Sequence, residues 1–372
     1  MISGDRIRQA RELRGLTQIE LANRIDVDQS MIAHIEGGRA MPSEEVLQAI
    51  VFQTGFPTSF FKQETAPNFP LGSLLFRARA SVTKREKSEA HQYGKLIFDS
   101  VKRMEPHLTK IPLRLPRLTE DPVTAARVTR SAVSLAPDAP IRNLIHTLEK
   151  NGVLILAIPV PLKGRDAFSV WADSEPIRPV IVITGESPGD RLRYSIAHEL
   201  GHLVMHQAIK GGLAEIEREA DQFAAEFLMP TDAIRRELTS PVTLTSLAAL
   251  KPRWGVSLQA LVRRAREVKA ITDRQYKYLM QQLSLRGWRT QEPANLDVPV
   301  ETPRAVRKMA EVLFGIPINY KKLAADLRLP RSLAREIIEA HAAYPYLTIK
   351  PSVRYSPEPG KLLDFTRSKV SR

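Results

Sequence analysis

Hydrophobic residues recur at helical spacing through the first sixty residues, and the breaks fall at residues that begin or end helices. A short helix is expected over 7–13. Thr17 begins the next helix, with Glu20 at its third position to complete a capping box. A tight turn at 26–28 leads into a third helix over 29–36. Two short helices joined by such a turn are typical of a helix-turn-helix unit.

The middle of the chain mixes patterns of strand length with helical patterns. "VLILAIPV" and "RPVIVITG" are β-branched runs of strand length on either side of "DAFSVWAD". "AHELGHLVMH" and "EREADQFAAEFLMP" follow, with apolar residues at helical spacing. Helix-turn-helix rhythms recur in "VTLTSLAALKPRWGVSLQALVRRARE" and "YKKLAADLRLPRSLAREIIEAHA". We expect an α+β, mostly helical fold: a helix-turn-helix bundle, an HExxH domain with a small sheet, and a helical C-terminal region.

The stretch "AHELGHLVMH" carries candidate zinc chemistry. His198 and His202 are four residues apart, so both imidazoles share one helix face and can bind one zinc ion. Glu199 stands beside that face, where a carboxylate can act as a general base. The pattern alone is also compatible with buried structural histidines. A catalytic zinc ion needs a third protein ligand, which Glu217 offers on the next helical run. Asp221 follows one turn later and can fix the tautomer of a ligand imidazole.

Two nearby residues leave alternatives open. Glu219 competes with Glu217 as the third ligand, but it faces another direction on the helix. His206 completes an i, i+4, i+8 series, yet the Gly and His that a metzincin site requires after the second histidine are missing. We expect His206 to support or cap the site. His206 and Tyr194 are the nearest candidates in sequence for a donor to an oxyanion.

"RLRYSIAHELGHLVMH" followed by "EREADQFAAEFLMP" resembles the ImmA/IrrE metallopeptidases, over roughly residues 140–290. The resemblance implies a gluzincin-like domain with His198, His202 and Glu217 as zinc ligands. It also implies Glu199 as the general base, and a protein substrate such as a repressor, cut at one or few sites.

"LTQIELANRIDVDQSMIAHIEGGRAMPSEEVLQAI" resembles the Xre/Cro-type repressor domains, which implies an operator-like DNA site as a partner. Asp26 stands where that turn usually has Gly, and Asp tolerates a left-handed backbone better than most residues. The side chains expected to face base edges are Gln29, Ser30, Ala33 and His34. Phosphates would be held by Gln18 and Arg39. A helical module used for protein contacts is the alternative.

The net charge of +14 is unevenly distributed. Residues 1–66 carry 7 Lys/Arg against 9 Asp/Glu, whereas residues 230–372 carry 26 against 13. Because phosphate contacts dominate DNA affinity, the acidic balance of the first segment implies a dimer or basic groups from elsewhere. The basic C-terminal third is compatible with nucleic acid, with an acidic partner and with a solvated surface. A toxin–antitoxin or phage-defence component that binds nucleic acid through this third is a further hypothesis.

Composition narrows the class of protein. The 372 residues include no cysteine, which excludes disulfides, thiolate zinc sites and cysteine nucleophiles. No run of about 18 apolar residues is present, so no membrane partner is expected. The first ten residues are polar and charged, without the apolar core of a signal peptide. A cytoplasmic protein is therefore expected, and the resemblance adds a bacterial or phage setting.

The chain divides into four expected segments. They are residues 1–66 as the helix-turn-helix domain, 67–140 as linker and connecting helices, 141–290 as the zinc metallopeptidase domain, and 291–372 as a basic helical region with a flexible tail. This organisation predicts a DNA-binding transcription regulator, either as a homodimer or with basic groups from elsewhere, fused to a zinc-dependent endopeptidase that cleaves a regulatory protein. The alternative is a regulator or antitoxin-like binder whose metal domain senses metal or ligand and never cuts. Glu199 argues against it, because a structural zinc site needs no base.

Overall fold

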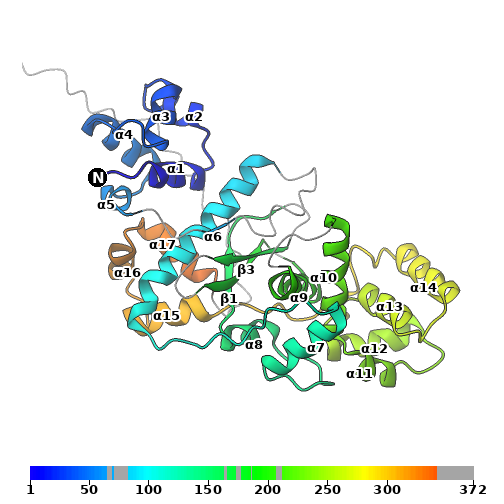
Figure 1. Cartoon of the computed structure of the whole chain (residues 1–372). Helices are drawn as coiled ribbons and strands as arrows, with labels where there is room; N and C mark the ends of the chain where they lie inside the picture. Colours follow the sequence, from blue (N-terminus) through cyan, green and yellow to red (C-terminus); the bar gives the residue numbers. More distant parts are fainter. Residues whose placement is uncertain are drawn as a thin grey trace, which may run out of the picture.

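A computed structural model describes residues 1–64, 69–70, 83–162, 166–172, 177–185, 187–206 and 212–341. Within these ranges the chain forms seventeen α-helices and one three-stranded sheet (Figure 1). The predicted fold class, α+β and mostly helical, is confirmed. Residues 342–372, which include the flexible tail expected at the end of the last segment, lie outside the described residues, as do residues 65–68 and 71–82 around the start of the expected linker segment.

The N-terminal helices are α1 (Gly4–Leu13), α2 (Gln18–Arg24), α3 (Gln29–Glu36), α4 (Glu44–Thr54) and α5 (Thr58–Phe61). α1 begins three residues earlier than the pattern predicts. The predicted capping box is present: the Thr17 hydroxyl accepts from the Glu20 amide at 3.1 Å, and the Glu20 carboxylate accepts from the Thr17 amide at 2.6 Å. Asp26 adopts a left-handed backbone (φ 54°) in the turn between α2 and α3. The helix-turn-helix geometry is therefore confirmed.

The sheet consists of β1 (Leu154–Ile158), β2 (Ala167–Ala172) and β3 (Arg178–Thr184), in the order β1-β3-β2. β1 pairs with β3 in parallel, and β2 pairs with β3 antiparallel at the other edge. The two predicted strands are confirmed. The segment between them, for which the pattern predicts no element, is β2.

Alternate residues of the strands enter two different hydrophobic cores. Leu154 and Leu156 face a first core with α1, α4, α5 and α6 (Lys84–Met104). Ile155 and Ile181 face a second core. Because side chains alternate along a strand, one small sheet serves as the wall between both cores.

The second core is formed by the two helices before the sheet and by the helices that follow it. Its helices are α7 (Pro122–Ala132), α8 (Leu144–Lys150), α9 (Gly189–Met205), α10 (Leu213–Leu228), α11 (Thr231–Glu237), α12 (Leu244–Trp254), α13 (Leu258–Glu267) and α14 (Asp273–Leu285). Two short 3-10 helices are η2 (Glu105–His107) and η3 (Ala294–Leu296). The C-terminal helices α15 (Ala305–Phe314), α16 (Tyr320–Leu327) and α17 (Arg331–Glu339) return to the first core.

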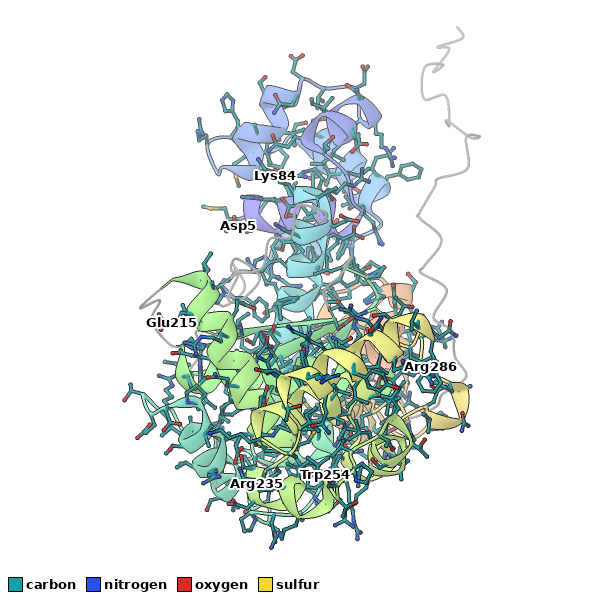
Figure 2. All side chains as sticks on the ribbon, turned by 90° about the vertical axis from the view of Figure 1, so that its right-hand side faces the viewer. Asp5, Lys84, Glu215, Arg235, Trp254 and Arg286 are labelled. Carbon is teal, nitrogen blue, oxygen red and sulfur yellow. The ribbon has the colours of Figure 1, made fainter. Side chains whose placement is uncertain are left out.

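The helix-turn-helix unit is attached to α6 through buried polar contacts. Arg6 Nη2 lies 2.9 Å from Asp99 Oδ2, and both side chains are largely buried. The Glu12 carboxylate accepts from Ser88 Oγ at 2.6 Å and from Gln92 Nε2 at 2.7 Å. Figure 2 shows Lys84, the first residue of α6, among the N-terminal helices. The first core therefore joins the N-terminal unit to the remainder of the chain, and the predicted segment boundaries stay predictions.

The end of α17 is fixed to the sheet by His341, which is fully buried. Its Nε2 accepts from the Ala157 amide of β1 at 2.9 Å, and its Nδ1 donates to the Ile337 carbonyl at 2.6 Å. Burial lowers the pKa of His341 to about 4. The imidazole is therefore neutral at physiological pH, as acceptance at Nε2 requires.

Among the described helices, none has the length and apolar character needed to cross a membrane.

Candidate metal centre

Two histidines of α9 converge at the base of a cleft. His198 and His202 lie one helical turn apart, and their Nε2 atoms are 3.1 Å from each other. The side chains are 3% and 4% exposed, respectively. Burial among apolar residues of the second core keeps bulk water from solvating these imidazoles, so their positions are set by protein contacts.

The third member of the cluster comes from α10, which packs across α9. Glu217 Oε2 lies 3.5 Å from His198 Nε2, and Glu217 Oε1 lies 3.5 Å from His202 Nε2. The close approach of the helices depends on Gly201, where an added Cβ would lie 3.1–3.2 Å from the Phe223 side chain. A side chain at position 201 would require Phe223 of α10 to shift by a few tenths of an ångström.

The donor set and its spacing fit a zinc ion. One ligand atom from each of His198, His202 and Glu217 lies within 4.8 Å of the other two. Tetrahedral ligands at about 2.0–2.1 Å from zinc stand roughly 3.3 Å apart, close to the separations observed here. Two imidazoles and one carboxylate are also the donor types of catalytic zinc sites. These are the residues of the described chain that could hold the metal.

Hydrogen bonds orient both imidazoles from behind. Asp221 Oδ1 lies 2.7 Å from His198 Nδ1. His202 Nδ1 lies 3.0 Å from His206 Nδ1, and His206 Nε2 lies 3.0 Å from Glu219 Oε2. Glu219 therefore contacts His206, away from the three clustered donors, and His206 stands behind His202. Partners of this kind fix the ring orientation of metal-binding histidines.

Glu199 is held at the cleft by a residue that sequence reasoning missed. The Ser169 hydroxyl, on β2, donates to Glu199 Oε2 at 2.7 Å, and the Glu199 side chain is buried. Ser169 is the polar member of an otherwise apolar strand face with Ala167 and Trp171. That exception in "DAFSVWAD" is the one sequence signal that could have indicated it.

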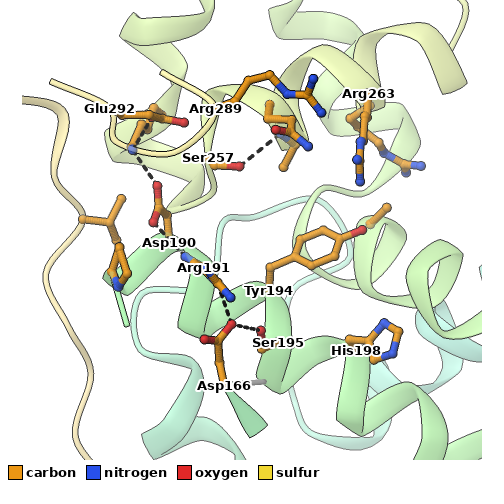
Figure 3. Close-up of a pocket in the computed structure, with 18 of the residues that line it drawn as sticks. Asp166, Asp190, Arg191, Tyr194, Ser195, His198, Ser257, Arg263, Arg289 and Glu292 are labelled. Atoms are coloured by element: carbon orange, nitrogen blue, oxygen red, sulfur yellow. Dashed lines mark hydrogen bonds and ion pairs between the residues drawn. The ribbon is translucent and has the colours of Figure 1, made fainter. Parts of the chain in front are cut away.

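The cleft above the cluster has a volume of about 1500 Å³ (Figure 3). His198, Glu199 and Glu217 line one end. Tyr194 lies beside them, and its hydroxyl donates to the Asp221 carbonyl at 3.2 Å. Burial raises the pKa of Tyr194, so the phenol keeps its proton. Tyr194 therefore borders the cleft as a donor, whereas His206 does not line it.

The opposite wall of the cleft is formed by α13 and the segment after α14. Arg263 and Arg289 are exposed there, and Figure 3 shows both above Tyr194. Lys251 closes one end by pairing with Asp190 and Glu292, each at 2.6 Å. Burial alone would lower the pKa of Lys251, but these two carboxylates outweigh burial and raise it.

A buried ion pair joins α10, the helix that carries Glu217, to α13. Glu226 is fully buried and pairs with Arg264, and Arg127 of α7 lies 2.9 Å from the same carboxylate. Burial tends to raise the pKa of Glu226, but hydrogen bonds from Thr231 and the two arginines lower it. Arg264 therefore forms a buried ion pair inside the protein and adds no positive charge to the surface, although it belongs to the basic C-terminal third of the sequence.

The recognition helix expected to bind DNA presents its residues at the surface. Gln29, Ser30 and His34 are exposed, Ala33 is half-buried, and Arg39 is exposed beyond the end of α3. Gln18 Nε2 donates to Glu36 Oε2 at 2.8 Å, and Gln29 Nε2 donates to Gln18 Oε1 at 2.8 Å. Gln18 therefore orients Gln29, in addition to the phosphate contact expected of it.

Two segments of the chain, the N-terminal helices and the region around the candidate metal centre, match known protein families. Residues 7–53 match the helix-turn-helix family, and residues 148–266 match a peptidase family described as the IrrE N-terminal-like domain. A search of curated proteins finds no match. The first match indicates a DNA-binding regulator and the second a metallopeptidase. The chain thus joins a segment similar to Xre-like helix-turn-helix domains to a segment similar to the IrrE/ImmA-like peptidases, as the sequence motifs predicted.

Proposed function

We propose that the protein is a zinc-dependent endopeptidase fused to a DNA-binding regulator. The observation that carries the proposal is the convergence of His198, His202 and Glu217 beside a buried Glu199 at the base of an open cleft. The three donors would hold zinc, and Glu199 is not among them. A site that served structure alone would have no use for a second carboxylate placed beside the ligands.

The residues around the cluster supply the remaining parts of peptide hydrolysis. A bound zinc ion supplies Lewis acidity to a carbonyl and makes water more acidic. Glu199, oriented by Ser169, accepts a proton from the attacking water and delivers it to the leaving amine. Tyr194 keeps its proton and lines the cleft, so its hydroxyl can exchange the Asp221 carbonyl for a substrate oxygen that gains negative charge.

The substrate is a protein segment in an extended conformation. β2 stands at the edge of the sheet and packs on α9, where Trp171 Nε1 donates to the Leu203 carbonyl at 3.0 Å. An edge strand can pair with an added strand through main-chain hydrogen bonds. We propose a regulatory protein such as a repressor as the substrate, with the N-terminal unit bound at the operon under its control.

The test compares wild type with Glu199→Gln in cells by proteome-wide detection of new protein N-termini, with and without stress. The amide keeps the shape of the carboxylate but cannot accept the proton, and general-base catalysis contributes about 10²–10⁴-fold. The variant should keep its zinc and its fold and lose cleavage. Identical N-terminal profiles under all conditions would reject the peptidase and favour the sensor that never cuts.

A further inference from the structure

The C-terminal helices α16 and α17 repeat the geometry of the helix-turn-helix unit formed by α2 and α3. α2 begins after the cap Thr17, and α16 begins after the cap Asn319. The side-chain oxygen of each cap accepts the amide of the residue three positions later, at 3.1 Å in both cases. The family match at residues 7–53 does not include this second pair of helices.

The turn between the helices is the same in both units. Asp26 has φ 54° and Arg328 has φ 56°. The next amide returns to the preceding helix in each: Val27 to the Ala22 carbonyl at 3.1 Å, and Leu329 to the Ala324 carbonyl at 2.9 Å. Thr17 and Asn319, Asp26 and Arg328, and Val27 and Leu329 are all separated by the same number of residues. The two units therefore share, at matching positions, the cap bond of the first helix, the left-handed turn residue and the amide that bonds back to the first helix.

The buried positions also correspond. Leu21 and Ala22 of α2 are buried between the helices, as are Leu323 and Ala324 of α16. The second helix of each unit begins at the matching position, α3 at Gln29 and α17 at Arg331. The faces presented to solvent can therefore be compared directly.

The two exposed faces differ in charge. In the first unit, Gln29, Ser30 and Ala33 occupy the positions that begin the recognition helix. The matching residues of α17 are Arg331, Ser332 and Arg335, all of which are exposed. The exposed cations of the second unit are Lys321, Lys322, Arg328, Arg331 and Arg335. The Arg335 guanidinium lies 4.8 Å over the Tyr320 ring, which holds it at the junction of the two helices.

We infer that α16 and α17 form a second DNA-binding unit, with α17 entering the major groove of double-stranded DNA. Arginines at the start of such a helix can form bidentate hydrogen bonds with guanine, and lysines of the first helix can neutralise phosphates. The first unit is acidic overall, and the second supplies the positive charge that it lacks. In Figure 1, α16 and α17 are drawn on the same side as the N-terminal helices, with which they share the first core.

The first experiment measures binding of the zinc-loaded full chain to a duplex selected from a random library, as a function of KCl concentration. Lys322→Gln with Arg331→Gln removes two exposed charges from the second unit. Arg274→Gln with Lys277→Gln, both exposed on α14, removes the same charge elsewhere. The first pair should lower the salt slope by about 2 and the affinity by on the order of tenfold or more, and the control pair should change neither.

The second experiment locates DNA directly and does not depend on losing affinity. The chain has no cysteine, so Ser332→Cys offers one thiol for a tethered DNA-cleaving reagent. This conjugate should cut the duplex at a position different from that cut by a Ser30→Cys conjugate, and an Arg274→Cys conjugate should not cut. An unchanged salt slope, or a Ser332 conjugate that leaves the duplex intact while the Ser30 conjugate cuts it, overturns the proposal. Neither outcome depends on peptidase activity.

Discussion

The proposed metal centre and the proposed recognition surface of α3 are built in opposite ways. His198 and His202 are almost fully buried, and hydrogen bonds fix each imidazole from behind. Gln29 and Ser30 are exposed, and Gln18 orients Gln29 by a hydrogen bond at the surface. A zinc site requires donors that are already in place, because small displacements cost affinity and rate. A DNA-reading side chain must instead reach outward to a partner. We therefore expect substitutions at the metal centre to have the larger effects.

The largest effect should follow removal of a ligand. We predict that Glu217→Ala reduces bound zinc from about one ion per chain to nearly none, because two imidazoles alone do not hold the ion at a catalytic site. Glu219→Ala is the comparison variant: Glu219 contacts His206 behind His202, so its loss should weaken zinc binding far less than loss of a ligand. Metal analysis after dialysis measures both. Loss of zinc from the Glu219 variant with retention in the Glu217 variant would reverse the assignment.

A smaller loss of zinc affinity is expected when a residue that hydrogen-bonds a ligand histidine is replaced. Asp221→Asn keeps the size of the side chain but loses the charge that orients His198 through Nδ1. Such substitutions typically weaken metal affinity about 10–100-fold. Glu215→Gln, near the exposed start of α10, is the control. Competition against a chelator gives both affinities, and equal values would mean that Asp221 contributes nothing to the centre.

The sequence predicted those features that depend only on residues close to one another in the chain. The turn at Asp26, the capping box at Thr17 and the spacing of His198 and His202 depend on residues within one or two helical turns, and a sequence pattern records them directly. The position of Glu217 on a second helix was also readable, because the two helices are each strongly periodic. The resulting match to two known families came from these same stretches.

Features that depend on distant contacts could not be read in this way. Ser169 reaches Glu199 only because β2 packs against α9. Gly201 leaves room for the Phe223 side chain, which lies on another helix. Arg264 counts as positive charge in the sequence, yet it is buried against Glu226. The helix-turn-helix spacing of the C-terminal helices was visible in the sequence. Packing on the first core, however, determines which of their lysines and arginines face solvent.

The smallest effect should come from the residue that supports the DNA-reading surface. Gln18→Ala removes the hydrogen bond to Gln29 and the bond to Glu36, while both helices keep their caps and buried side chains. One such bond contributes about 0.5–1.5 kcal/mol, so operator affinity should fall only several-fold. Asn23→Ala, exposed on the same helix, is the control and should leave affinity unchanged. Titration of a labelled operator at fixed salt measures the difference. An affinity equal to that of wild type would contradict this role of the hydrogen bond, whereas a loss as large as that caused by replacing Gln29 itself would mean that Gln18 also makes the phosphate contact expected of it.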